Sequence, residues 1–313
     1  MNISKPQESS NLFFLAPLAG YTDLPFRSVV KKFGCDLTFS EMINANAIVY
    51  NNEKTKKMMV KSPNENPFFI QIAANNSENA IKAVEIINEI DEISGIDINL
   101  GCPVKKARRS GFGGILLKKE NHPLLKKIVS AIVKTSKKRV SAKIRLGFDE
   151  DIVGDISKML EDLGVEFLTI HARLVTQMYK GEAKYDSIAN AVQLLSIPVI
   201  ANGDITDYEK AKKVLEYTGA KGVAIGRGAI GKPWIFLEMK QKGNISSEQK
   251  KEVILEHFTQ MIKWYGEYGV ILFRKHLHGY SKGITNASEL RGKINSETDP
   301  EIIKKLIEEY FNV

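Results

Sequence analysis

The segment IDINLGCPVKKARRSGFGG, residues 96–114, says more about the fold than any other part of the chain. In its first half, apolar residues alternate with Asp97 and Asn99, which is the two-residue period of a β-strand. The strand ends at Gly101, and Cys102 follows on a turn, where loops on rigid scaffolds carry chemistry. Four basic residues and a glycine-rich turn come next, which favours a reacting thiol beside an anionic ligand. The alternative is a cysteine that is merely a small, buried, apolar residue.

Seven further apolar runs have the length of strands, and helical patterns separate them. We expect strands at residues 12–17, 36–40, 67–72, 140–145, 165–171, 198–201 and 222–225. Nearly continuous apolar runs are typical of parallel strands covered on both faces. Eight β/α units predict an α/β protein with a (β/α)8 TIM barrel, whose usual size is about 250 residues. An open doubly wound sheet is the alternative, but the GxGxxG that often follows its first strand is missing here.

Helix start signals agree with this division. Thr22 or Asp23 can cap the first helix, Ser77 can cap the helix that runs to about residue 90, and Thr206-Asp207-Tyr208-Glu209 has the form of a capping box. Further barrel helices are expected at residues 121–138, 151–163 and 186–196.

The pattern changes after residue 240. Residues 241–248 are polar and suit a linker, and no strand pattern follows them. Apolar periodicity predicts helices at residues 247–265, 268–282 and 299–311. We therefore expect a catalytic barrel at residues 1–240 and a small C-terminal all-helical domain at residues 241–313.

The positive charge of the chain is regional. The net charge is +8 over 313 residues, but residues 105–139 alone hold twelve Lys/Arg and one acid. Such a patch is expected where a protein meets a polyanion, although a solvated basic helix is the plain alternative.

Cysteine usage and hydropathy bear on the compartment. Cys35 and Cys102 are too few for a disulfide framework and do not have zinc-site spacing. The first residues lack the apolar core of a signal peptide, and no apolar run approaches the roughly 18 residues of a membrane span. We expect a cytoplasmic monomer that uses no metal and binds no membrane.

The carboxyl ends of the barrel strands define the expected active site. The polar residues predicted to gather there are Glu41, Gln71, Asn99, Cys102, Lys143, His171, Asn202 and Arg227. Lys143 lies inside an apolar strand, where a lysine is rarely tolerated without an anionic partner. A single histidine at a strand end, such as His171, is more often structural.

The loops after the last two strands form the usual phosphate site of this fold. They read Asn202-Gly203-Asp204 and Gly226-Arg227-Gly228. Glycines allow close approach of backbone N–H groups, a following helix N-terminus adds partial positive charge, and an arginine can fork onto phosphate oxygens. Together with Lys143 and Gln71, these loops favour FMN, because a cation near the flavin N1–C2 edge stabilises the reduced ring. Two ordinary glycine-containing turns remain the alternative.

With these residues in place, the chain resembles the bacterial tRNA-dihydrouridine synthases. The resemblance runs over almost the whole chain, in APLAGYTDLPFR (16–27), SEM (40–42), FIQIA (69–73), DINLGCPVKK (97–106), AKIRLGFD (142–149), HAR (171–173) with QMYKGEA (177–183), NGDI (202–205), GRGAIGKPWIF (226–236) and RKHLHGYSKG (274–283). Other FMN barrels, such as dihydroorotate dehydrogenases, do not usually share the Cys-Pro segment or the helical tail.

The resemblance implies an enzyme that reduces specific uridines in tRNA to 5,6-dihydrouridine. NADPH would reduce FMN, hydride would pass from flavin N5 to uridine C6, and Cys102 would protonate C5. The residues that would bind FMN are Pro17, Leu18, Gln71, Lys143, His171, Asn202, Gly203, Asp204, Gly226 and Arg227. Asn99 would contact the target uracil, and Arg173 would lie near the substrate. The base would be swung out of its stack, while the basic region and the helical tail hold the tRNA.

Five residues, in three segments, depart from the usual family pattern. Leu18 stands where Met is common, Leu174-Val175 replaces Thr-Arg after HxR, and Phe112 and Gly114 differ from the smaller or polar residues usual in the loop after the cysteine. Two other function classes stay open from the residues alone: an RNA chaperone that kept only the barrel, and a flavin reductase of free pyrimidines.

Overall fold

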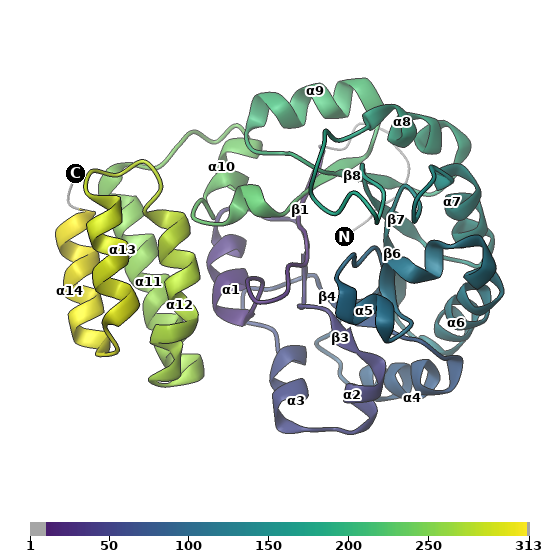
Figure 1. Cartoon of the computed structure of the whole chain (residues 1–313), viewed down its shortest axis with the longest axis horizontal. Coiled ribbons are helices and arrows are strands. Elements are labelled where there is room, and N and C mark those ends of the chain that lie inside the picture. The colour runs from purple at the N-terminus through teal and green to yellow at the C-terminus, as the bar shows by residue number, and fades with distance from the viewer. Residues whose placement is uncertain (1–10, 312–313) are drawn as a thin grey trace.

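The computed structural model describes residues 11–311, which form a parallel β-barrel with a helical bundle at one side (Figure 1). The barrel strands are β1 (Leu12–Leu15), β2 (Thr38–Phe39), β4 (Phe68–Ala73), β5 (Gly95–Leu100), β6 (Arg139–Arg145), β7 (Phe167–His171), β8 (Val199–Asn202) and β9 (Gly222–Ile225). They pair in parallel in the order β1-β9-β8-β7-β6-β5-β4-β2, and a parallel bridge between Phe14 and Leu37 nearly closes the ring. A short β3 (Ile43–Asn44) adds to β4. The predicted (β/α)8 barrel is confirmed.

Helices cover the outside of the barrel between successive strands. They are α1 (Leu24–Lys32), α4 (Ser77–Asn88), α6 (His122–Thr135), α7 (Val153–Asp162), α8 (Tyr185–Leu194), α9 (Tyr208–Thr218) and α10 (Ile235–Met239), with the short α2 (Ala45–Val49), α3 (Glu53–Met59) and α5 (Lys105–Arg109).

Asp23 caps α1, as one of the two predicted alternatives, by accepting from Phe26 N at 3.1 Å. The predicted Ser77 cap and the Thr206 capping box are wrong. Asn76 and Asp207 cap α4 and α9 instead, because each is the last extended residue and its side-chain oxygen reaches the N–H three residues on.

Phenylalanine rings fill the interior of the barrel below the carboxyl ends of the strands. Phe14 packs edge-on against Phe39 and Phe167, with ring centroids 6.2 and 5.9 Å away, and Phe69 contacts the same two rings. These rings come from the inward positions of four strands. Two residues further along, the inward positions become polar, for example Gln71 after Phe69. An apolar plug therefore supports a polar layer at the carboxyl ends of the strands.

The C-terminal bundle consists of four helices, α11 (Ser247–Tyr265), α12 (Tyr268–Tyr280), α13 (Ala287–Ser296) and α14 (Pro300–Tyr310). The sequence predicted only α11, α12 and α14. The helix α13 was missed because it is short and mostly polar, with only Leu290 and Ile294 buried. The bundle has an apolar core of its own, separate from that of the barrel. The domain boundary at 240/241 stays a prediction.

The bundle lies against α1, which contacts α11 (Figure 1). The closest approach is between backbones, because a Cβ added at Gly231 would lie 2.2 Å from the carbonyl carbon of Gly279 on α12. Trp234 stacks on Tyr280 beside this contact, with ring centroids 6.2 Å apart. Between residues 11 and 311, none of the helices combines the length and apolarity needed to cross a membrane.

Candidate active site

A buried carboxylate, Asp97, forms the base of the polar layer. It is 1% exposed and accepts hydrogen bonds from Gln71 Nε2 at 2.7 Å and Ser141 Oγ at 2.6 Å. Burial raises the pKa of Asp97 to about 6, because loss of solvation outweighs these two hydrogen bonds. Asp97 and Ser141 were not among the predicted site residues.

A chain of amide hydrogen bonds runs from Asp97 to the Cys102 turn. Gln71 Oε1 accepts from Asn99 Nδ2 at 2.8 Å, and Asn99 Oδ1 accepts from Cys102 N at 3.0 Å and Gly101 N at 3.3 Å. An ionised carboxylate can only accept hydrogen bonds. Asp97 therefore fixes the Gln71 amide with its NH₂ group toward Asp97 and its oxygen toward Asn99. The same logic turns the Asn99 oxygen toward the Cys102 turn.

Cys102 lies on the turn after β5, at the carboxyl end of the strands, and its side chain is half-buried. Burial raises the pKa of its thiol above the usual value, which keeps the thiol protonated at neutral pH. The turn is tightly backed, since a Cβ added at Gly113 would lie 2.9 Å from Cys102 Cβ.

Two of the departures from the family pattern contact each other behind this turn. A Cβ added at Gly114 would lie 2.6 Å from a methyl group of Val175, which is buried. A branched residue at position 175 therefore requires glycine at position 114.

Lys143 and Asn202 continue the polar layer on β6 and β8, and Lys143 lies beside Asn99 in the β5–β6 register. Lys143 Nζ donates to Asn202 Oδ1 at 3.0 Å, and Asn202 Nδ2 donates to Ala224 O at 2.7 Å. Burial, helped by the nearby charge of Arg145, lowers the pKa of Lys143 to about 8. Lys143 is thus mostly protonated at neutral pH, and its pKa is close enough to neutral that a ligand beside it could change its protonation state.

Beside them, His171 is neutral and has an unused nitrogen. Burial, followed by the nearby cations Lys143 and Arg145, lowers the pKa of His171 far below its usual value. Among residues 11–311, His171 Nδ1 and Thr169 Oγ1 are buried polar atoms without a hydrogen-bond partner. Such atoms are rare in native proteins and indicate that another group belongs in this space.

The predicted phosphate loops lie together at the ends of β8 and β9. Asp204 links the two loops by accepting from Arg227 Nη2 at 3.3 Å, and it also accepts from Arg173 Nη1, after β7, at 3.0 Å. Gly203 has φ +130°, and a Cβ added at Gly226 would meet only Ala16 and Leu18, at 3.7 Å or more. Pro17 and Leu18, after β1, are half-buried on that side.

Of the two loops, only the one after β8 leads into a full α-helix, α9. Only a single 3₁₀ turn, Arg227–Ala229, follows Gly226, because the chain must turn toward α10. Arg227 is exposed and its guanidinium is only partly engaged by Asp204, so it is the cation that can reach a phosphate.

Arg173 is buried and does not lie on the surface of the mouth. It is 2% exposed, and its donors bond Asp204 and the carbonyl oxygens of Lys180 and Gly181. These contacts favour a role in positioning Asp204, and direct binding of substrate by Arg173 stays a prediction.

Arg145 and Tyr179 complete the mouth and were not predicted. Arg145 Nε donates to Gly101 O at 3.0 Å and Nη1 donates to Leu174 O at 2.9 Å, which ties the Cys102 turn to the next loop. The Tyr179 ring is half-exposed and lies 5.6 Å from Arg145 Cζ and 4.9 Å from Arg227 Cζ. The signal for Arg145 was available, because it follows Lys143 by two residues on β6 and so shares its inward face.

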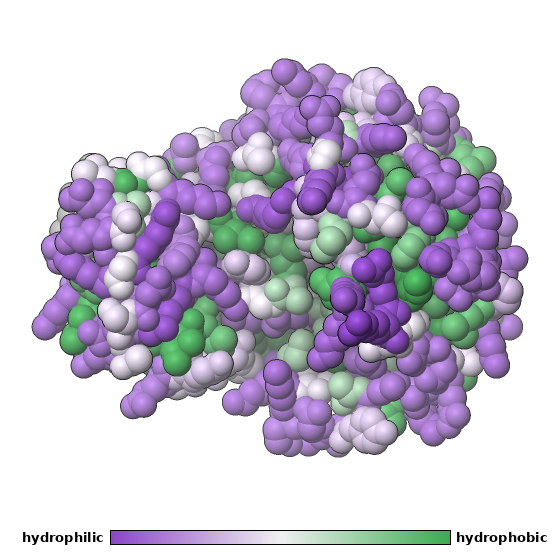
Figure 2. Space-filling model, viewed as in Figure 1, coloured by the Kyte–Doolittle hydropathy of each residue, from purple (hydrophilic) through white to green (hydrophobic). Residues whose placement is uncertain are grey.

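The basic region does not form one face. The helix α5 lies at the barrel mouth, and the most hydrophilic side chains of this view gather over it, beside the hollowed centre of the face (Figure 2). The helix α6 then runs back to the amino end of β6, where Lys137 pairs with Glu89 and Arg139 with Glu166. The second half of the region at residues 105–139 therefore leads away from the mouth, and contact of the whole region with a polyanion stays a prediction.

Comparison with known proteins decides the family. Residues 14–312 match the family described as Dihydrouridine synthase (Dus). The chain belongs to the dihydrouridine synthase family. It is 46% identical over 301 residues to a "Probable tRNA-dihydrouridine synthase" of Helicobacter pylori, covering 96% of this chain and 92% of that protein. It is 41% identical over 314 residues to "tRNA-dihydrouridine synthase B" of Pasteurella multocida, covering 97% and 93%. The resemblance inferred from the motifs is confirmed.

Solved structures agree with the fold of this dihydrouridine synthase family member. An old yellow enzyme homologue from Zymomonas mobilis superposes with a TM-score of 0.56 at 13% identity, over 75% of this chain and 90% of that one. A morphinone reductase variant in complex with tetrahydroNAD gives a TM-score of 0.54 at 11% identity, over 75% and 87%. At such low identity the likeness concerns the barrel alone.

Proposed function

We propose that this protein reduces specific uridines of tRNA to 5,6-dihydrouridine, with FMN as its flavin and NADPH as the reductant. The observation that carries the proposal is the position of the Cys102 thiol. It lies at the barrel mouth, on a turn that the Asp97–Gln71–Asn99 chain holds, next to a wall with an unpaired His171 nitrogen and a Lys143 ammonium group.

The residues present fit a flavin phosphate. The unpaired His171 Nδ1 and the Lys143 ammonium would serve the polar edge of the ring together with Gln71, and Pro17 and Leu18 would lie beside it. The glycine backbone at Gly203, which has φ +130°, and at Gly226 would hold the phosphate together with the exposed Arg227, with Asn202 and Asp204 orienting Lys143 and Arg227. When bound, FMN would supply the hydride from N5 to uridine C6, and NADPH would supply the electrons.

Cys102 would donate the proton that C5 requires. Its raised pKa suits a group that must be protonated before it acts, and general acids of this kind contribute about 10²–10⁴ in rate. Within residues 11–311, one Asn99 Nδ2 hydrogen is used by Gln71, and the other is available to a uracil oxygen. Asn99 would thus bind the base and hold the acid at once.

The tRNA would present its base unstacked, since a base inside folded RNA cannot reach a barrel mouth. The basic α5 beside the mouth and the bundle next to α1 are the surfaces we assign to the RNA backbone. We keep a cytoplasmic location, a monomeric state and a barrel of residues 1–240 as parts of the same proposal.

The first experiment is an absorbance spectrum of the purified protein, followed by mapping of dihydrouridine at each tRNA position in a deletion strain. We expect a flavin spectrum and the loss of dihydrouridine at defined positions. A colourless protein that cannot be reconstituted with FMN refutes the cofactor assignment. Unchanged dihydrouridine in the strain favours an RNA chaperone, and salt-insensitive reduction of free pyrimidines favours a small-molecule reductase.

A further inference from the structure

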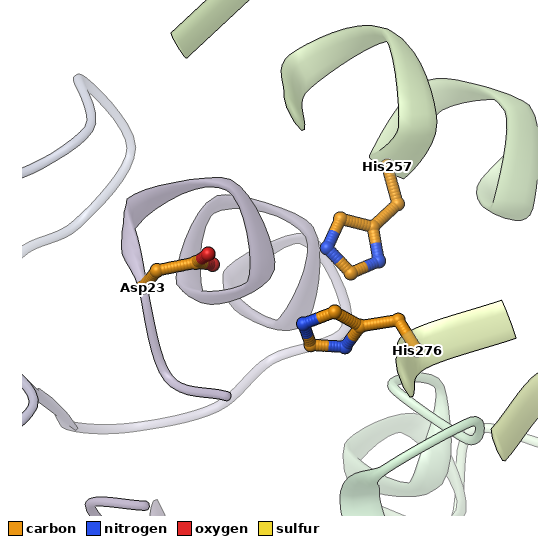
Figure 3. A group of neighbouring side chains, drawn as sticks. All are labelled: Asp23, His257 and His276. Atoms are coloured by element: carbon orange, nitrogen blue, oxygen red, sulfur yellow. The ribbon is translucent and has the colours of Figure 1, made fainter. Parts of the chain in front are cut away.

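Three buried side chains meet where the bundle contacts the barrel (Figure 3). Asp23 comes from the N-terminus of α1, His257 from α11 and His276 from α12. Asp23 is 5% exposed and both histidines are fully buried. One ligand atom from each lies within 4.8 Å of the others, although the three residues are far apart in the sequence.

Most imidazole nitrogens of this cluster have no hydrogen-bond partner in the described residues. In the described part of the chain, neither nitrogen of His276 has a hydrogen-bond partner, and His257 Nε2 has none either. The other nitrogen of His257, Nδ1, lies 3.0 Å from the Tyr280 hydroxyl. Unpaired buried polar atoms need an explanation in a native protein, and three of them in one place point to a missing partner.

We propose that Asp23, His257 and His276 bind one divalent transition-metal ion, with Zn²⁺ as the best fit. Two imidazole nitrogens and one carboxylate oxygen are a ligand set for zinc and its neighbours, whereas Ca²⁺ and Mg²⁺ prefer oxygen ligands throughout. His257 would bind through Nε2, because the Tyr280 hydroxyl holds Nδ1 as the outer partner that metal-bound histidines usually have.

The surroundings suit a structural ion. The rings of Phe26 and Phe273 wall both imidazoles, with centroids 5.0 to 6.1 Å away, and keep bulk water out. The Asp23 carboxylate also accepts from Phe26 N and from the Tyr265 hydroxyl at 3.2 Å, which fixes its direction.

Charges of both signs face the cluster. Lys275 and Arg27 oppose a cation at Asp23, whereas Glu41 favours it. Since the three ligands lie on the barrel and on two helices of the bundle, the ion would fasten the bundle to the barrel. It would be taken up as these parts dock during folding.

The test is metal analysis of the full-length holoenzyme, purified without a histidine tag, by inductively coupled plasma mass spectrometry. We expect about one ion per chain, with a nitrogen- and oxygen-only first shell by X-ray absorption. Asp23→Asn is the sharpest variant, because asparagine still caps a helix but is a poor metal ligand. His276→Gln removes a ligand directly. The control is His278→Gln on the same helix, whose ring Nε2 lies 3.1 Å from Asn295 Oδ1 and takes no part in the cluster.

Asp23→Asn and His276→Gln should lose the ion and the rise in melting temperature that zinc gives to chelator-stripped, refolded protein, and the control should keep both. If His276→Gln does not fold, Asp23→Asn alone decides. Wild-type protein that holds no stoichiometric ion after refolding with zinc overturns the proposal, as does an ion retained by Asp23→Asn. The cluster would then be three side chains around a buried water.

Discussion

Replacement of Asp97 by asparagine should test the hydrogen-bond chain that holds the Cys102 turn. The substitution keeps the shape of the side chain but removes its acceptor-only character. In the variant, the side-chain amides of Gln71 and Asn99 can both rotate by 180°. In the wild type, the N–H groups of Gly101 and Cys102 donate to the Asn99 oxygen, but a rotated Asn99 would present its NH₂ group to them instead.

The expected effect on turnover follows from that mismatch. A buried donor left without an acceptor costs about 1–3 kcal/mol, and each 1.4 kcal/mol is tenfold in population. Asp97→Asn should therefore lower the rate of uridine reduction by about tenfold. Flavin should still bind, because the phosphate loops are on the other side of the mouth, but its affinity should fall somewhat, because Gln71 would turn over at the edge of the ring.

Stability should move the other way. The folded-state pKa of Asp97, about 6, lies above the usual aspartate value of 3.8, so the native state holds the proton more tightly. That contribution is fully present below pH 4 and is lost as the pH rises through 6, a penalty of about 3 kcal/mol at 1.36 kcal/mol per pKa unit. Asparagine has no such penalty, so the variant should gain stability relative to wild type between pH 4 and pH 7.

The assay is single-turnover reduction of tRNA uridine across pH 5–8, with urea unfolding at the same pH values. Wild-type turnover should fall below about pH 6, where protonated Asp97 can donate as asparagine does, and Asp97→Asn should lack this acid limb. Ser141→Ala is the control, because it removes one donor to Asp97 and leaves the direction of the amide chain intact. Full turnover in Asp97→Asn, with the acid limb unchanged, would refute the reasoning.

Three further results are expected. Cys102→Ala should keep flavin and tRNA binding, by absorbance and filter binding, but lower uridine reduction by about 10²–10⁴, and normal turnover would remove Cys102 from its role. Gly231→Ala should lower the melting temperature and expose the bundle to protease, because its Cβ meets the α12 backbone. Gly243→Ala, also at positive φ but with open space around it, is the control and should keep the wild-type melting temperature. Equal losses in the two variants would contradict the packing argument. Gly114→Ala should destabilise the protein by about 1–3 kcal/mol in urea, mainly by overpacking against Val175. Val175→Ala should restore part of the loss, since the added Cβ would still lie 3.0 Å from Cys102 O; simple addition of the two losses would contradict the contact.

The upper polar layer could be predicted because two rules combine there. Parallel strands bring their carboxyl ends to one face, and a polar residue at the end of an apolar run stands out in the sequence. Gln71, Asn99, Lys143, His171 and Asn202 were all found in this way, and hydrogen bonds link four of them.

What lies one layer lower was harder to predict. Asp97 was read as an ordinary polar position of a two-faced strand, but this strand is covered on both sides and the aspartate faces inward. Arg173 shows a different limit, because its partners come from Asp204 and from carbonyls of a loop whose course no local pattern specifies. The split of the basic residues likewise depends on the direction of α6, which composition alone does not contain.

The free-energy cost of ionising the buried Asp97 is itself an argument that it orients the amide chain. A carboxylate sealed above phenylalanine rings is expensive to ionise, and an asparagine of the same shape would fit the space without that cost. What asparagine cannot do is choose a direction, since an amide hydrogen-bonds equally well when turned over. A turn that must present a thiol in one orientation requires such a choice, and the Gln71 and Asn99 amides transmit it but cannot make it. In the proposed reaction, Asp97 thus selects the orientation from the layer below Cys102, where it is buried away from water.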